Sequence, residues 1–391
     1  MKFDFDKVVD RHGTKCLKYD FAKERGRSDD MLPLWVADMD FQTAPGIQKS
    51  LSDAVAHGIY GYSEGKDDYF QAAAGWYEKH FGWKVEKEWL IKTPGVVFAL
   101  AMAVKAYTKE GDAVLLQQPV YYPFSEVITD NHRRLINSPL QQVDGHYEIN
   151  FEEFEQKIVE ENVKLFLMCS PHNPVGRVWK EWELRKIGDI CLKHNVLVVS
   201  DEIHSDFTYG ENIHHVFASL DEKYAAITTT CTAPSKTFNI AGLQISNIWI
   251  SNPELRARFR AEVTAAGYSQ VNLMGLVACQ AAYETGEDWL KELKIYLEGN
   301  LDYVRTFLKE NLPEIKLTEP EGTYLLWLDF ESLGMKEEQL KDLVENKAKL
   351  WLDSGAMFGP DGEGFERINI ACPREILKQA LTQLAESVHD R

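Results

Sequence analysis

The sequence predicts an α/β protein with two lobes, a large lobe built on a mostly parallel sheet sandwiched by helices and a smaller α+β lobe. Three observations support this fold class. The chain has 391 residues, more than one hydrophobic core usually serves. Short β-branched runs alternate with helical patterns between about residues 90 and 250. A long amphipathic pattern then separates this region from a C-terminal stretch of mixed character.

The large lobe is predicted from four apolar runs, at residues 113–116, 163–168, 196–199 and 245–250. Because these runs lack polar alternation, we expect strands that are buried on both faces. The helical patterns between them favour parallel crossovers. We place this lobe at residues 47–285.

The smaller lobe begins with a helix predicted over residues 288–309, which Pro313 ends. One stripe of this helix is apolar and comprises Leu290, Leu293, Leu297, Leu301, Val304 and Leu308. Residues 324–328 predict a strand, and residues 338–344 and 376–388 predict helices. We expect residues 1–46 to join residues 286–391, so that both chain ends build this lobe.

Composition excludes several classes of function. The 43 Lys and Arg residues against 61 Asp and Glu residues give a net charge of -18, which disfavours nucleic acids and anionic membranes. No apolar run is long enough to span a bilayer, and the first residues lack an export signal. The six scattered cysteines form no C-x-x-C pair, so we expect neither zinc nor disulfides and predict a cytoplasmic protein. His214-His215 lacks metal-ligand spacing and is predicted to lie on a surface loop.

The strongest local motif surrounds Lys236, in Ala233-Pro-Ser-Lys-Thr-Phe-Asn239. A lysine captures carbonyl compounds when burial lowers its pKa. Taken alone, the motif fits an ordinary surface lysine as well. The motifs described next favour the carbonyl-capturing lysine over the surface lysine.

Two further motifs follow predicted strands. Asp201, in Asp201-Glu-Ile-His204, is an acid at a strand end, which suits a cationic ring nitrogen or, more simply, a helix N-cap. Asn173, next to Pro174 and close to Pro171, has restricted backbone geometry and could donate to a ligand oxygen or mark a turn. Gly95 precedes a predicted helix, where the backbone amides form either a phosphate cradle or a plain turn.

In this order the motifs resemble fold-type I pyridoxal-phosphate enzymes of the class I/II aminotransferase superfamily, over essentially the whole chain. Four segments resemble its MalY/PatB-type C–S lyase (cystathionine β-lyase) branch more closely: Leu34-Trp-Val-Ala-Asp-Met-Asp-Phe41, Pro119-Val-Tyr-Tyr-Pro123, Asp201-Glu-Ile-His204 and Ser235-Lys-Thr-Phe-Asn239.

The resemblance implies pyridoxal 5'-phosphate as cofactor. It makes Lys236 the Schiff-base lysine and proton shuttle, Asp201 the partner of the pyridine nitrogen and Asn173 the donor to the phenolic oxygen. It also implies a set of further cofactor contacts: Tyr121 stacked on the ring, His204 near the phenolic oxygen, and Gly95, the Val96 and Val97 amides, Ser235 and Thr232 around the phosphate. Tyr60 would reach the phosphate of the neighbouring subunit, which requires a homodimer.

For the substrate, the resemblance implies that Arg367 grips the α-carboxylate, with Arg374 as the fallback and Ala37 in the same pocket. Without it, either arginine would be a surface ion pair. Two departures from the aminotransferase pattern are His204, where a tyrosine is usual, and Gln244, where an arginine is common. His204 could also be a core histidine whose ring binds backbone groups.

The implied activity is α,β-elimination of L-cystathionine or L-cysteine-type amino acids to a thiol, pyruvate and ammonia. Tyr122 or Lys236 would protonate the leaving sulfur. Two alternatives stay open: an aminotransferase on the same scaffold, and a regulator that acts by binding a partner protein.

Overall fold

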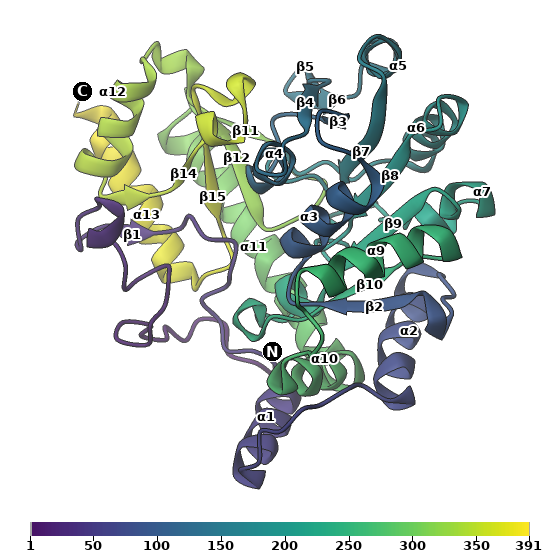
Figure 1. The fold of residues 1–391 in the computed structure, drawn as a ribbon. Helices are drawn as coiled ribbons and strands as arrows, with labels where there is room; N and C mark the ends of the chain where they lie inside the picture. The colour runs from purple at the N-terminus through teal and green to yellow at the C-terminus, as the bar shows by residue number, and fades with distance from the viewer. Residues whose placement is uncertain (1, 391) are drawn as a thin grey trace.

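The computed structural model describes residues 2–390 and has two lobes (Figure 1). The large lobe holds a seven-stranded sheet with the spatial order β2 (Leu90–Thr93), β10 (Ser246–Trp249), β9 (Thr228–Thr232), β8 (Leu197–Asp201), β7 (Val163–Cys169), β3 (Ala113–Leu116) and β4 (Arg134–Asn137). The strands from β9 to β4 are mutually parallel. The prediction of a mostly parallel sheet is therefore confirmed.

Helices cover both faces of this sheet, as Figure 1 shows. Val114 and Leu116 of β3 pack in one core with α3 (Val96–Tyr107), α4 (Pro123–Thr129) and α9 (Pro253–Ala265). Ala113 and Leu115 point the other way and pack with α5 (Phe151–Glu160) and α6 (Glu181–Lys193). Successive side chains of a strand alternate between faces, so a run that is apolar throughout needs a helix layer on each side.

The remaining helices of the large lobe lie around the sheet and at its edge. They are α1 (Pro45–His57), α2 (Asp67–Phe81), α7 (Glu222–Ala225), α8 (Pro234–Thr237) and α10 (Leu273–Thr285). A small hairpin pairs β5 (Gln141–Val143) with β6 (His146–Glu148).

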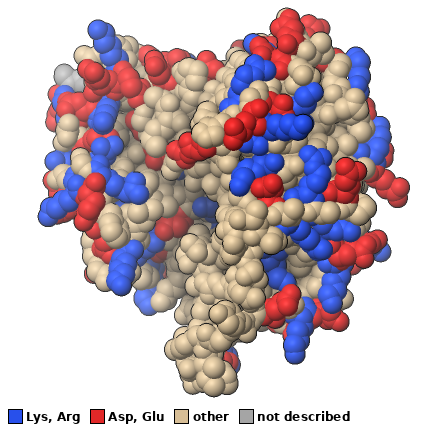
Figure 2. All heavy atoms as spheres, viewed as in Figure 1, with Lys and Arg blue, Asp and Glu red and all other residues tan. Residues whose placement is uncertain are grey.

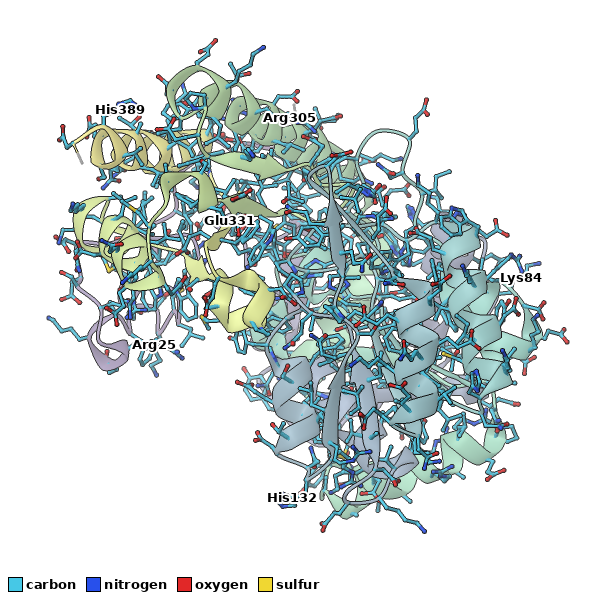
Figure 3. The ribbon with its side chains drawn as sticks, turned by 90° about the horizontal axis from the view of Figure 1, so that it is seen from above. Arg25, Lys84, His132, Arg305, Glu331 and His389 are labelled. Atoms are coloured by element: carbon cyan, nitrogen blue, oxygen red, sulfur yellow. The ribbon has the colours of Figure 1, made fainter. Side chains whose placement is uncertain are left out.

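The smaller lobe, as predicted, is taken to begin with α11 (Glu287–Asn311), whose apolar stripe is buried as the spacing predicts. Its four-stranded sheet has the order β11 (Lys316–Thr318), β12 (Leu325–Asp329), β15 (Phe365–Asn369) and β14 (Asp353–Ser354). The helices are α12 (Glu337–Lys341), which runs into a π-helical turn at Asp342–Lys347, and α13 (Arg374–His389). In Figure 3, Arg25, Glu331 and His389 mark this lobe, and Lys84 and His132 mark the large one.

The N-terminal segment joins the smaller lobe, because β1 (Leu32–Pro33) pairs in parallel with β13 (Leu350–Trp351). Both ends of the chain therefore contribute to the smaller lobe, as predicted. The boundaries after residues 46 and 285 stay a prediction.

Residues 245–250 contain a strand as predicted, β10, and it runs antiparallel to both β2 and β9. One expectation needs correction. His214 was expected on a surface loop, yet it is buried and its Nε2 lies 2.9 Å from Oε2 of Glu202. A buried carboxylate needs such a partner, which sequence spacing does not reveal.

Within residues 2–390, no helix is long and apolar enough to cross a membrane. The same part of the chain contains no cluster of His, Cys, Asp and Glu side chains arranged to hold a metal ion. All six cysteines are free thiols, and all but Cys16 are buried.

Candidate active site

Three of the predicted side chains come from neighbouring strand ends. Asn173 follows β7, Asp201 ends β8, and Lys236 lies in α8 just after β9. The register pairs Cys169 with Asp201 and Asp201 with Cys231, so these strands end level with one another. The carboxyl edge of a parallel sheet is where open α/β folds gather ligands.

The Lys236 side chain is partly buried and donates from Nζ to the carbonyl oxygen of Ala37 at 2.9 Å. Burial lowers its pKa to about 8, with Asp38 and Asp201 acting in the opposite direction and Arg367 in the same one. A substantial fraction of the amine is therefore neutral near physiological pH. This is the property a carbonyl-capturing lysine needs.

Asp201 is 6% exposed, and burial raises the pKa of its carboxyl group to about 7. The Ile203 amide donates to its Oδ1 at 3.1 Å and lowers the pKa, whereas the neighbouring charge of Glu202 raises it. A carboxylate in this setting gains most from a cationic ligand.

Arg367, on β15, is 2% exposed and lies against Asn173. Its NH1 group donates to Asn173 Oδ1 at 3.0 Å, and its NH2 group donates to the Trp35 carbonyl oxygen at 2.8 Å and to Asp353. The guanidinium also lies over the Phe358 ring at 4.9 Å. Its Nε is buried and has no partner among residues 2–390, so the Nε hydrogen remains free to bind a ligand.

Gly95 immediately precedes α3 and has φ 174°, an extended conformation open to any residue. A Cβ built there meets nothing within 4 Å. Open space therefore adjoins the first-turn amides of α3, those of Val96 and Val97 included, which no helical carbonyl satisfies. Ser235 lies at the start of α8, partly exposed.

Thr232 does not fit the phosphate role. Its hydroxyl group donates to the Asn247 carbonyl oxygen at 2.8 Å and accepts from Trp249 Nε1 at 3.0 Å. Because a hydroxyl group has a single hydrogen, none is left for a phosphate oxygen.

His204 is buried, and desolvation together with Lys236 and Arg367 lowers its pKa to about 3. The ring is neutral, and its Nδ1 has no partner in the part of the chain described. It therefore does not behave as a core histidine whose ring nitrogens are both satisfied by backbone groups. Tyr121 and Tyr122 lie with ring centroids 5.0 Å apart, and burial raises the pKa of both phenols.

Two predicted residues lie apart from this group. The Nε of Arg374 donates to Asn300 Oδ1 at 2.6 Å, so its side chain is bound to α11. This contact favours Arg367 over the fallback Arg374, whose role stays a prediction. Tyr60 is 60% exposed, and its hydroxyl group donates to the Val55 carbonyl oxygen of its own chain at 3.1 Å.

Sequence reasoning missed Tyr324 and Asp353. The Tyr324 hydroxyl group donates to the Ala37 carbonyl oxygen at 3.0 Å, next to the Lys236 amine, and its ring contacts that of His204. Asp353 pairs with Arg367 across β14 and β15. An acid in a short strand near an apolar run was the only available signal for Asp353, and many surface acids share it.

Comparisons with known proteins agree with this geometry. Residues 30–384 match the family model described as aminotransferase class I and II. The chain is 43% identical to cystathionine β-lyase PatB of Bacillus subtilis, over 97% of this chain and 98% of that protein. It is 34% identical to protein MalY of Escherichia coli, over 99% of each chain. Cystalysin from Treponema denticola, solved with pyridoxal 5'-phosphate, superposes with a TM-score of 0.96 and 39% identity over all of both chains. The chain therefore belongs to the class I and II aminotransferase family and has the type I fold of pyridoxal-phosphate enzymes.

Proposed function

We propose that this protein is a pyridoxal-phosphate-dependent C–S lyase that cleaves L-cystathionine and related β-thio amino acids to a thiol, pyruvate and ammonia. The observation that carries the proposal is the meeting of Lys236, Asp201, Asn173 and Arg367 at one sheet edge. Its likeness to a cystathionine β-lyase at 43% identity supports elimination as the reaction type.

The residues present fit the cofactor. Lys236 offers a partly neutral amine for the aldehyde, and Asp201 offers a buried carboxylate for the ring nitrogen. Asn173 accepts through Oδ1 from Arg367, which leaves its amide hydrogens to donate to the phenolic oxygen. The space beside Gly95 would take the phosphate against the start of α3. When bound, pyridoxal phosphate supplies a carbonyl group that captures amines and a cationic ring that accepts electrons from the α-carbon.

Arg367 would bind the substrate carboxylate, since its planar donor fork matches a carboxylate and its Nε has no other partner among the described residues. The Lys236 amine, displaced by the substrate amine, would take the α-proton at Nζ. The Ala37 carbonyl oxygen orients Nζ for this step. The carbon–sulfur bond then breaks, and the sulfur takes a proton from Lys236 or from Tyr122.

Tyr122 can serve as the acid because a phenol carries its proton at neutral pH. Burial raises the pKa of this phenol further, which keeps it protonated but makes it a weaker donor. With L-cystathionine, elimination and hydrolysis of the released enamine consume one water and give L-homocysteine, pyruvate and ammonia.

A homodimer is part of the proposal. The segment around α1 projects from the large lobe and shows few charged side chains on the face in Figure 2. Its large exposed apolar side chains are Val55, Ile59, Tyr60 and Tyr62, the last 94% exposed. Exposed apolar clusters of this kind mark association surfaces. We propose that Tyr60 reaches the phosphate of the neighbouring subunit, and that the enzyme works in the cytoplasm.

Incubation of the holoenzyme with L-cystathionine tests the reaction type. We expect pyruvate and free thiol in equal amounts without any added keto acid. Product formation that depends on a 2-keto acid would instead identify an aminotransferase.

A further inference from the structure

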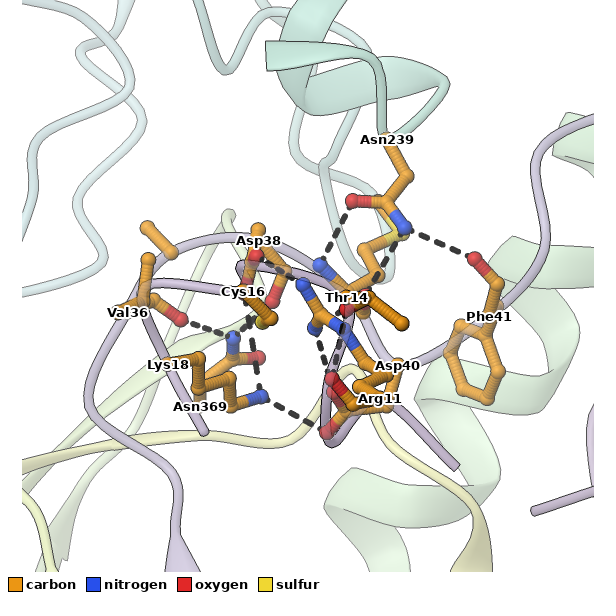
Figure 4. Close-up of polar contacts among 12 residues, drawn as sticks. Arg11, Thr14, Cys16, Lys18, Val36, Asp38, Asp40, Phe41, Asn239 and Asn369 are labelled. Atoms are coloured by element: carbon orange, nitrogen blue, oxygen red, sulfur yellow. Dashed lines mark hydrogen bonds and ion pairs between the residues drawn. The ribbon is translucent and has the colours of Figure 1, made fainter. Parts of the chain in front are cut away.

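The segment at residues 36–41, here called the strap, crosses the active site and carries the Ala37 carbonyl oxygen that holds Lys236. Two asparagines fix its backbone (Figure 4). Asn369 donates to the Val36 and Asp38 carbonyl oxygens at 2.7 and 2.6 Å. Asn239 accepts from the Met39 amide at 2.9 Å and donates to the Met39 and Phe41 carbonyl oxygens. Each asparagine lies near a functional residue, Asn239 after Lys236 and Asn369 after Arg367.

Four charged side chains form a cluster against the strap: Arg11, Lys18, Asp38 and Asp40. Arg11 donates to Asp38 at 2.6 Å and to Asp40 at 2.7 Å, and also to the Met39 carbonyl oxygen. Lys18, 0% exposed, donates to Asp40 at 2.8 Å and lies 4.0 Å from Asp38. Arg11 and Lys18 both come from the N-terminal segment, far from the strand ends that carry the other site residues.

The charges of this cluster act electrostatically on the Lys236 amine. Asp38 favours the protonated form of Lys236, and it lines with Lys236 and Arg11 one cavity of about 510 Å³. The two cations balance the two carboxylates, so the amine faces a neutral cluster rather than an anionic one. The other charged or titratable groups that face the amine or the cluster are Asp201, Arg367, His204 and Tyr324 on the site side, and Tyr19 and Cys372 beside Asp40.

We propose that Arg11 and Lys18 are positioning residues of the active site, which hold the strap so that the Ala37 carbonyl oxygen meets the Lys236 amine and which neutralise Asp38 so that this amine stays reactive at neutral pH. The inference rests on the proposed role of Lys236. It adds Arg11 and Lys18, two cations of the N-terminal segment, to the groups that set the pH at which the Lys236 amine becomes neutral.

The test follows capture of pyridoxal phosphate by the apoenzyme, a readout that needs no turnover. Only the neutral amine attacks the aldehyde, so the initial capture rate measured against pH reports its titration. The cofactor's own titrations are common to every variant. We expect the wild-type rate to rise through about pH 8, because the pKa of Lys236 is lowered to about that value.

Substitutions of opposite charge are expected to move this midpoint in opposite directions. Arg11→Met leaves Asp38 unbalanced, favours the ammonium form and shifts the midpoint upward by about half a unit or more. Asp38→Asn is expected to shift the midpoint downward. The double variant, Arg11→Met with Asp38→Asn, is expected to have a midpoint near that of the wild type. Arg11→Lys keeps the positive charge, so its midpoint is also expected to stay close to that of the wild type. A loosened fold would slow every variant without this pattern of signs.

Arg27→Met is the matched control, since Arg27 is 25% exposed against 21% for Arg11 and pairs with Glu345 at 2.7 Å. It is expected to keep the wild-type midpoint. If Arg11→Met does not fold, Asp38→Asn and Arg11→Lys still give the two comparisons that decide. Equal midpoints in variants that capture the cofactor would overturn the inference. A wild-type apoenzyme that captures no cofactor would instead contradict the proposed function.

Discussion

Burial moves the pKa values of Lys236 and Asp201 toward each other, the amine down to about 8 and the carboxyl group up to about 7. Each group is therefore held in a form that is less charged than it would be in water. Burial of these two groups is unfavourable for their charged forms. The cofactor would offset this effect, because an aldehyde reacts with the neutral amine and a cationic ring nitrogen pairs with the carboxylate. The site is thus built for a ligand that carries both groups.

Asp201 predicts a pH-dependent penalty in the apoenzyme. The folded pKa lies above the unfolded one, so between about pH 4 and pH 7 the folded chain binds a proton that the unfolded chain releases. The contribution of this group to stability therefore falls as the pH rises through that window. Asp201→Asn should raise the free energy of unfolding of the apoenzyme by about 2 kcal/mol at pH 8.

The same variant should lower kcat/KM of the holoenzyme about a thousandfold, because the ring nitrogen loses its anionic partner. Urea unfolding at two pH values and steady-state kinetics check both effects. Below about pH 4 the two apoenzymes should be equally stable. A variant that is less stable than wild type at pH 8 would contradict the assignment of a penalised carboxylate.

Arg367→Lys keeps the positive charge next to Asp353 but loses the planar fork. We expect KM for L-cystathionine to rise about 10- to 100-fold while kcat changes less, because the lost contact is made to bound substrate throughout the reaction. Steady-state kinetics at matched cofactor content measure this. An unchanged KM would remove Arg367 from carboxylate binding.

At this scale the sequence located Lys236, Asp201, Asn173 and Arg367 because each stands in a motif at a strand end or in a strand. It did not find Tyr324 or Asp353, whose roles arise from contacts between segments that the sequence does not place together. It also could not separate Thr232 from the phosphate contacts, since only the pairing of β9 with β10 directs that hydroxyl group to Asn247. The contact of Arg374 with Asn300 on α11 was likewise not visible in the sequence.

At the scale of single elements, the start of α3 makes a separable prediction. Gly95→Ala places a methyl group in open space without backbone strain, so the apoenzyme should keep its stability within about 0.5 kcal/mol. The methyl group would crowd the phosphate, and we expect affinity for pyridoxal phosphate to fall about tenfold or more. Equilibrium titration of the apoenzyme measures this loss.

Gly75→Ala is the control, because Gly75 lies in α2 and also has open space around its Cβ position. It should leave cofactor affinity unchanged. Equal affinities for all three proteins would show that α3 does not hold the phosphate.

The apolar runs predicted β3, β7 and β8 well, because a strand that is buried on both faces has apolar side chains along nearly its whole length. The direction of β10 was not predictable, since an apolar run carries no information on strand polarity. The two-residue strand β1 also escaped prediction. It exists because β13 is available to pair with it.

At the scale of the whole molecule, the exposed position of Tyr60 predicts complementation between subunits. A Tyr60→Ala chain keeps its own Lys236 but lacks the tyrosine it would lend, and a Lys236→Ala chain is the converse. In a mixed dimer, the site with Lys236 receives Tyr60 from its partner. Random exchange of subunits should therefore restore about a quarter of the wild-type sites.

Pyruvate formation before and after subunit exchange measures this, with light scattering to confirm the dimer. Each variant alone serves as the control. If Tyr60 acts within its own chain, or if the protein is a monomer, mixing will restore nothing.

The central claim is that one amine, that of Lys236, holds the cofactor. Borohydride reduction of the holoenzyme followed by peptide mass spectrometry tests it most directly, because reduction makes the link between amine and cofactor permanent. We predict one pyridoxyl phosphate group per chain, on the peptide that contains Lys236, and none in a Lys236→Ala variant treated in the same way. A label on another lysine, or an unlabelled chain that still forms pyruvate from L-cystathionine, would contradict the account.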